Sequence, residues 1–155
     1  MEHTGQVCTV RDVCTAVVAV ASVADPPREE RMPQCLKEVL DSWGSTWMWK
    51  ALRLVGDNVW IRGVIERGTL IAVTDGSYMR ELLPNLCSAA FILECSEGSG
   101  RIVGTFAEAS SGANAYRGEL LGLMAVHLIL LAANELWPRL HDQVVVLLDC
   151  LWGTK

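Results

Sequence analysis

The chain has 155 residues, of which 51% are hydrophobic and 20% are charged, and its formal net charge is −5 at pH 7. This size and composition indicate a globular domain with a sizeable core and exclude a disordered chain. The acidic balance, without a run of basic residues, argues against a nucleic-acid binder that relies on lysine and arginine alone. A function on nucleic acid would therefore need divalent metal ions.

Residues 1–34 are expected to form a leader and linker, poorly ordered or with a short strand. The twelve apolar or small residues at 13–24 have the length of a signal-peptide core, but Glu2 and Asp12 precede them and no clean positive region does. A bilayer-spanning helix needs about 20 apolar residues, so no membrane segment is expected. Three prolines within residues 24–34 predict a linker.

Residues 35–68 are expected to form a helical lead-in. Apolar residues at steps of three and four predict a helix over 35–55, on the positions Leu36, Val39, Leu40, Trp43 and Trp47. A second, short helix is expected, with an apolar face formed by Trp60, Ile61, Val64 and Ile65. Asp57 or Asn58 suits its N-terminal cap and Gly68 its C-terminal cap.

From residue 69 the hydrophobic pattern predicts a β-β-β-α-β order. The expected elements are strands at 69–75, 87–95, 101–107 and 143–149, and a long helix at 115–136. A five-residue loop makes the second and third strands an antiparallel hairpin, whereas the helix allows the fourth strand to lie parallel to the first. The predicted fold class is α/β with a mixed sheet. The helix is apolar almost all round, so it needs cover on more than one side.

Three acids fall at positions that could converge. Asp75 is expected to close the first strand, Asp149 the fourth, and Glu119 to lie in the first turn of the helix. Each has an ordinary alternative: an Asp-Gly turn, a strand-end acid and a helix-dipole acid, respectively. Parallel neighbouring strands, however, end about 4.8 Å apart, at the edge where α/β folds place their sites.

Carboxylates this close would repel one another unless a cation compensates them. Mg²⁺, or Mn²⁺ in its place, is a hard ion that prefers oxygen ligands. Two such ions can support phosphodiester hydrolysis. The spacing of the three acids therefore predicts a metal site at the carboxyl end of the sheet.

Three stretches carry a resemblance to a known family. "TDGSY" at 74–78, "AYRGELLGL" at 115–123 and "LLDC" at 147–150 resemble motifs of the ribonuclease H family, in the form found in retroelement polyproteins. The lead-in with Trp60, Ile61 and Arg62 is similar to the connector before such domains. The resemblance covers residues 57–151, and the first two motifs together are its most specific part.

The resemblance implies hydrolysis of the RNA strand of RNA–DNA hybrids with Mg²⁺ or Mn²⁺. The residues that it implies are Asp75, Glu119 and Asp149 as catalytic metal ligands and Gly76, Ser77 and Arg117 as substrate-binding residues. It also implies a reverse transcriptase domain of the parent polyprotein as a partner. The six cysteines contain no C-x-x-C spacing. They are therefore expected to be reduced thiols of an intracellular protein, in the cytoplasm or nucleus, rather than zinc ligands.

The chain also departs from the family pattern. Leu148 stands where the family usually has Ser or Thr, and the family's fifth strand, later helices and fourth acidic ligand are missing. Residues 69–155 are therefore expected to be a C-terminally truncated domain with an exposed sheet edge and impaired activity. The alternatives are a non-catalytic remnant or interaction module, another two-metal nuclease or integrase, and a secreted or anchored protein.

Overall fold

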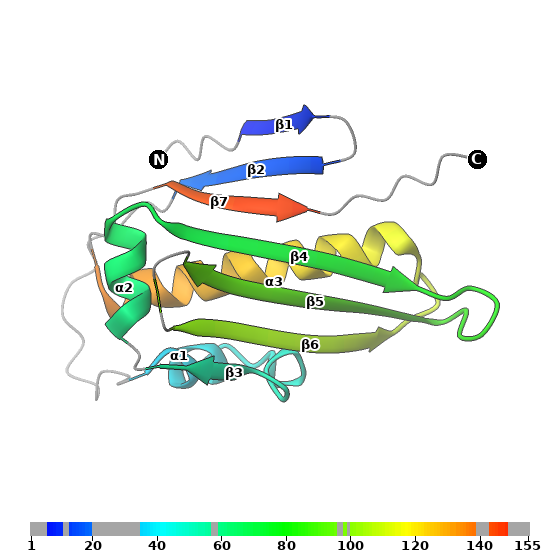
Figure 1. Cartoon of the computed structure of the whole chain (residues 1–155). Helices are drawn as coiled ribbons and strands as arrows, with labels where there is room; N and C mark the ends of the chain where they lie inside the picture. The colour runs from blue at the N-terminus through cyan, green and yellow to red at the C-terminus, as the bar shows by residue number, and fades with distance from the viewer. Residues whose placement is uncertain are drawn as a thin grey trace.

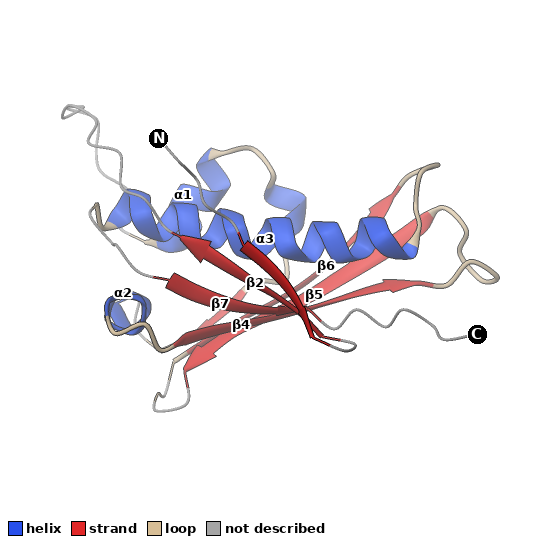
Figure 2. Ribbon diagram, turned by 90° about the horizontal axis from the view of Figure 1, so that it is seen from above, coloured by secondary structure: helices blue, strands red, loops and turns tan. Residues whose placement is uncertain are grey.

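A mixed β-sheet is the framework of the molecule (Figures 1 and 2). The computed structural model describes residues 6–10, 13–19, 35–56, 59–95, 98, 100–138 and 143–148. Its strands are β1 (Gln6–Val10), β2 (Val13–Ala19), β3 (Arg53–Val55), β4 (Leu70–Tyr78), β5 (Leu86–Cys95), β6 (Arg101–Ala109) and β7 (Gln143–Leu148). Its helices are α1 (Leu36–Ser42), the short 3₁₀ helix η1 (Thr46–Met48), α2 (Val59–Glu66) and α3 (Ala115–Leu136). α1 and α3 lie on one face of the sheet, and α2 lies at the end of the sheet.

The predicted α/β class with a mixed sheet is confirmed. The strand order is β1-β2-β7-β4-β5-β6-β3. β5 pairs antiparallel with both β4 and β6, and β7 pairs parallel with β4. The parallel pair runs from Ile71 opposite Val145 to Thr74 opposite Leu148. The long helix α3 makes the crossover between β6 and β7, and it matches the predicted range of 115–136.

The expected exposed edge beside the last strand is wrong, because β2 lies there. β2 pairs antiparallel with β7 along its whole length, from Cys14 opposite Leu148 to Ala19 opposite Gln143, and β1 pairs with β2 (Figure 1). The segment taken as a leader is rich in valine and threonine, which favour strands. The backbone N–H and C=O groups of β2 pair with the edge of β7 that was expected to be exposed.

The predicted helix over 35–55 is correct only in its first part. α1 ends at Ser42, and Gly44 follows with a φ of +82°, a conformation that favours glycine and terminates the helix. The chain then forms η1 and the edge strand β3, which pairs with β6. Trp49 is buried against Phe91, so tertiary contacts override the helical pattern here.

The second predicted helix is confirmed as α2. Ile61, Val64 and Ile65 are buried, and Gly68 has a φ of +66° just after the helix, as expected for a C-terminal cap. The predicted capping residues Asp57 and Asn58 lie outside the described residues.

α3 covers one face of the sheet and packs on β4 and β5, with α1 packed beside it on the same face (Figure 2). Part of its apolar surface stays uncovered, including Leu120, Met124 and Leu131. The apolar residues around His127 predict a position in the core, but His127 is exposed. Among the described residues, α3 is the one helix long and apolar enough to cross a membrane, a test that the core helix of a globular domain also meets.

Candidate metal and nucleic-acid site

Asp75 lies inside a strand, neither in a turn nor at a strand end. It is opposite Ala90 of β5, and Gly76 is opposite Ala89, while β4 continues to Tyr78. The predicted end of the first strand at residue 75 is therefore wrong, and so is the Asp-Gly turn. Pairing with β5 extends without a break through this dipeptide, and the backbone hydrogen bonds of the ladder outweigh the local turn preference.

Gly76 allows α3 to approach β4 backbone to backbone. A Cβ at this position would lie 2.4 Å from the backbone nitrogen of Glu119 and 2.6 Å from the carbonyl carbon of Gly118. Gly118 is constrained to a lesser degree, since its Cβ would lie 3.0 Å from the carbonyl oxygen of Ser88. The two glycines thus place the backbone of Glu119 directly against the residue that follows Asp75.

Glu119 itself lies in the second turn of α3 and not, as expected, in the first. Asn114 is the N-cap residue, and the first turn contains no acidic residue. The helix-dipole explanation for Glu119 is therefore wrong, because the effect falls off beyond the first turn. Glu119 is half-buried.

Of the three predicted metal ligands, the structure describes Asp75 and Glu119 and brings their backbones together. Asp149 lies outside the described residues, and the last described pair of the two parallel strands is Thr74 with Leu148. No group of three or more histidine, cysteine or acidic side chains that could hold a metal ion occurs among the described residues. The two described acids are oxygen donors of the kind that Mg²⁺ and Mn²⁺ prefer.

A shallow groove of about 400 Å³ lies next to Asp75 on the sheet. Because side chains alternate along a strand, Asp75 and Ser77 point away from the face on which Thr74 packs against α3. The groove is built mainly of small residues: Asp75, Ser77, Ser88, Ala89, Ala90, Thr105, Phe106 and Ala107. The acid and the hydroxyl of Ser77 therefore face a surface open to a large ligand.

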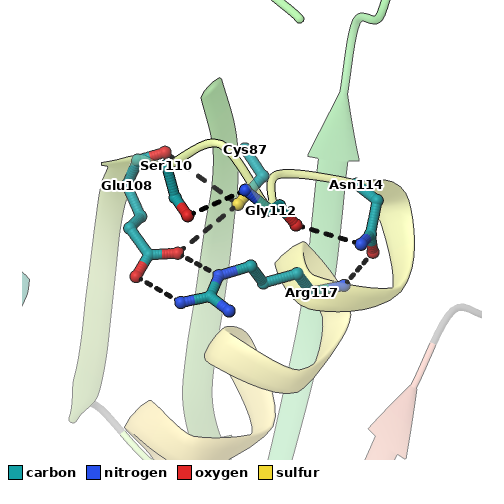
Figure 3. A network of polar contacts seen from close by, with 6 residues as sticks. All are labelled: Cys87, Glu108, Ser110, Gly112, Asn114 and Arg117. Atoms are coloured by element: carbon teal, nitrogen blue, oxygen red, sulfur yellow. Dashed lines mark hydrogen bonds and ion pairs between the residues drawn. The ribbon is translucent and has the colours of Figure 1, made fainter. Parts of the chain in front are cut away.

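Arg117 is held by an ion pair with Glu108 of β6 (Figure 3). Its Nη2 donates to Glu108 Oε1 at 2.8 Å, and its Nε donates to Oε2, so the guanidinium grips both carboxylate oxygens. The hydrogen bond from Arg117 lowers the pKa of Glu108, and the same bond raises the pKa of Arg117. Cys87 lies beside this pair, with its Sγ 3.9 Å from Glu108 Oε2.

The loop before α3 is fixed by its own hydrogen bonds (Figure 3). Asn114 Oδ1 accepts from the backbone N–H of Arg117 at 2.8 Å, and Asn114 Nδ2 donates to the carbonyl of Gly112 at 3.0 Å. The hydroxyl of Ser110 accepts from the N–H of Gly112 at 3.1 Å. These hydrogen bonds fix the backbone of Arg117, so a change in the position of its guanidinium requires rotation of the side chain alone.

Glu108 is the residue of this site that sequence reasoning missed. The third strand was expected to end at residue 107, whereas β6 continues to Ala109 and places Glu108 opposite Cys87. A longer strand could have been inferred from the alternation of apolar and polar residues, but the partner of Arg117 follows only from the position of α3.

Comparisons with protein-family models, with curated proteins and with solved structures give no match to this chain. Functional reasoning therefore depends on the residues of the site and on their geometry.

Proposed function

We propose that this chain is a ribonuclease H-like module derived from a retroelement, which hydrolyses the RNA strand of RNA–DNA hybrids with Mg²⁺ or Mn²⁺. The observation that carries the proposal is the contact between Gly76 and the backbone of Glu119. It brings the "TDGSY" and "AYRGELLGL" stretches together, and each stretch contains one of the two described acids. The close packing of the two stretches depends on one glycine from each, Gly76 and Gly118.

The proposal assigns the residues of the site to two roles, metal binding and substrate binding. Asp75 and Glu119, with Asp149, would hold the metal, while Gly76, Ser77 and Arg117 would contact the substrate backbone. A bound metal pair lowers the pKa of the attacking water and stabilises the leaving oxygen. The small side chains of the groove beside Asp75 would let a nucleic-acid backbone come close to the sheet. The reverse transcriptase domain of the parent polyprotein and an intracellular setting belong to the same proposal.

Cleavage of a defined substrate tests the proposal directly. The purified chain is incubated with a labelled RNA–DNA hybrid and Mg²⁺ or Mn²⁺, beside Asp75→Asn and Glu119→Gln. We expect weak, metal-dependent cleavage of the RNA strand that both variants lose. Asp41→Asn is the matched control, because it removes an exposed acid, paired with Lys37, from α1. Cleavage that survives Asp75→Asn would overturn the assignment of this residue.

Metal binding can be measured separately from catalysis. A metal that binds the folded chain stabilises it, so Mg²⁺ or Mn²⁺ should raise the thermal midpoint of the wild type and of Asp41→Asn but not of Asp75→Asn. Metal binding or hybrid binding without cleavage would favour a non-catalytic remnant or interaction module. Cleavage of duplex DNA would favour another two-metal nuclease or integrase.

A further inference from the structure

Arg117 presents its guanidinium from a fixed base at the start of α3. The Asn114 cap holds its backbone N–H, and the N–H of Gly118 donates to the Asn114 carbonyl at 3.2 Å. Arg117 precedes Glu119 by two residues in α3, and side chains two residues apart on a helix do not face each other. A substrate contact by Arg117 therefore depends on where its side chain points.

The side chain is already engaged by a carboxylate in the manner in which arginine binds phosphate. A guanidinium grips carboxylate and phosphate oxygens alike through two parallel N–H···O bonds. Both Glu108 oxygens accept from Arg117, which neutralises the cation. The Nε/Nη2 edge of Arg117 cannot pair with Glu108 and with a phosphate at the same time, and Glu108 already offsets the charge carried by the remaining Nη1 group.

The ion pair lies at the surface, where it can exchange. The side chain of Arg117 is 44% exposed and that of Glu108 is 21% exposed. Exposed pairs of this kind contribute little to stability and are screened by salt. Glu108 is the more enclosed partner, fixed by β6 and close to Cys87, so Arg117 is the partner that would move.

We propose that Glu108 competes with the substrate phosphate for Arg117 and thereby limits the affinity of this chain for RNA–DNA hybrid. The substrate class rests on the proposed function. A paired contact of this guanidinium edge with a phosphodiester requires the Arg117 side chain to leave Glu108, while the Glu108 carboxylate remains behind as a nearby negative charge. The chain has a net charge of −5, and the ion pair with Glu108 makes the positive charge of Arg117 less available to a phosphate.

Equilibrium binding of a labelled RNA–DNA hybrid without divalent metal tests the inference, because no hydrolysis can then contribute. We expect Glu108→Gln to lower the Kd by about fivefold to tenfold. Adding Arg117→Gln to Glu108→Gln should remove this gain.

Glu66→Gln is the matched control. It changes the net charge by the same amount and releases Arg62 from an ion pair of 2.8 Å on α2. Its Kd should stay within about twofold of wild type, since one surface charge away from the site acts only through screened long-range attraction. Equal tightening by both variants would mean a bulk charge effect and would overturn the inference, as would no tightening by Glu108→Gln.

A second variant covers the case in which Glu108→Gln does not fold. Glu108→Asp keeps the net charge but withdraws the carboxylate by one methylene, so it should weaken the grip on Arg117 and also lower the Kd. An unchanged or higher Kd in a folded Glu108→Asp chain would overturn the inference. A parallel cleavage assay with Mg²⁺ separates the two proposals. Tighter binding without cleavage would count against the nuclease proposal alone, and cleavage without tighter binding would count against the role of Glu108 alone.

Discussion

The two faces of the sheet differ in what their side chains do. On the face under α3, Thr74 and Phe91 are buried, and Gly76 touches helix backbone. On the opposite face, the same strands expose Val73 and Ile92 at 39% and 38%. Neighbouring residues of β4 thus alternate between fixing the position of α3 and presenting a surface. Asp75 belongs to the second set, so its substitution should affect ligands far more than the fold.

The largest expected difference between the two faces concerns neighbouring residues of β5. Phe91→Ala should lower the free energy of unfolding by about 3–5 kcal/mol, because it removes a fully buried ring in contact with Trp49 and Phe106. Ile92→Ala should cost less than about 1.5 kcal/mol, since that side chain is already partly solvated. Urea denaturation of both variants measures the comparison, and equal losses would contradict the assignment of the two faces.

A smaller loss is expected where the helix touches the strand. Gly76→Ala should destabilise by about 1–3 kcal/mol, because the added methyl group would meet helix backbone that cannot rotate away. Gly63→Ala on α2 is the control: its Cβ would meet only the flexible end of Arg67, and alanine favours a helix interior by up to about 1 kcal/mol. Thermal unfolding distinguishes them, and a neutral Gly76→Ala would mean that α3 is not seated on β4 as described.

Loss of the N-terminal cap of α3 should lower the free energy of unfolding less than disturbing the contact of α3 with β4. Asn114→Ala removes the side-chain cap and should cost about 1 kcal/mol, whereas Asn114→Asp keeps the acceptor and should cost less. Denaturant midpoints of the two variants measure the difference. If they were equally destabilised, the hydrogen bond to the N–H of Arg117 would not be the cause.

The smallest expected effect is a pH dependence of the ion pair between β6 and α3. Arg117 lowers the pKa of Glu108 below its ordinary value of 4.5, so the ionised carboxylate is favoured in the folded chain. Its stabilising contribution is present above pH 4.5 and is lost as the pH falls through the lowered pKa. The thermal midpoints of wild type and Glu108→Gln should therefore differ at neutral pH and converge in acid. A difference that persisted unchanged in strong acid would contradict the pairing.

Sequence reasoning succeeded where the determinants are local. The long helix over 115–136 follows from its length and apolar pattern, and α2 follows from three buried residues and a terminal glycine. It failed where partners are distant in sequence. Nothing within residues 35–55 shows that the chain turns at Gly44 and gives β3 to the edge of β6, and nothing within residues 13–19 identifies β7 as their partner.

The candidate site divides in the same way. Asp75, Glu119 and Arg117 can be selected from short motifs, because each motif contains its own residue. The turn at Asp75 was an error of local propensity, since the strand continues only because β5 runs opposite it. Glu108 could not be selected, because its role depends on a helix that follows it in the chain and folds back over β5.

The pairing of β2 with β7 has a consequence for the order of folding during synthesis. Cys14 and Leu148 are opposite each other, so β2 leaves the ribosome long before its partner β7. The sheet cannot be completed until nearly the whole described chain has been made, and closing so long a loop carries an entropic cost. Pairings of this sequence separation slow folding and leave apolar strands exposed meanwhile. Until β7 arrives, the edge of β4 and the edge of β2 that does not pair with β1 are open to pairing with other chains.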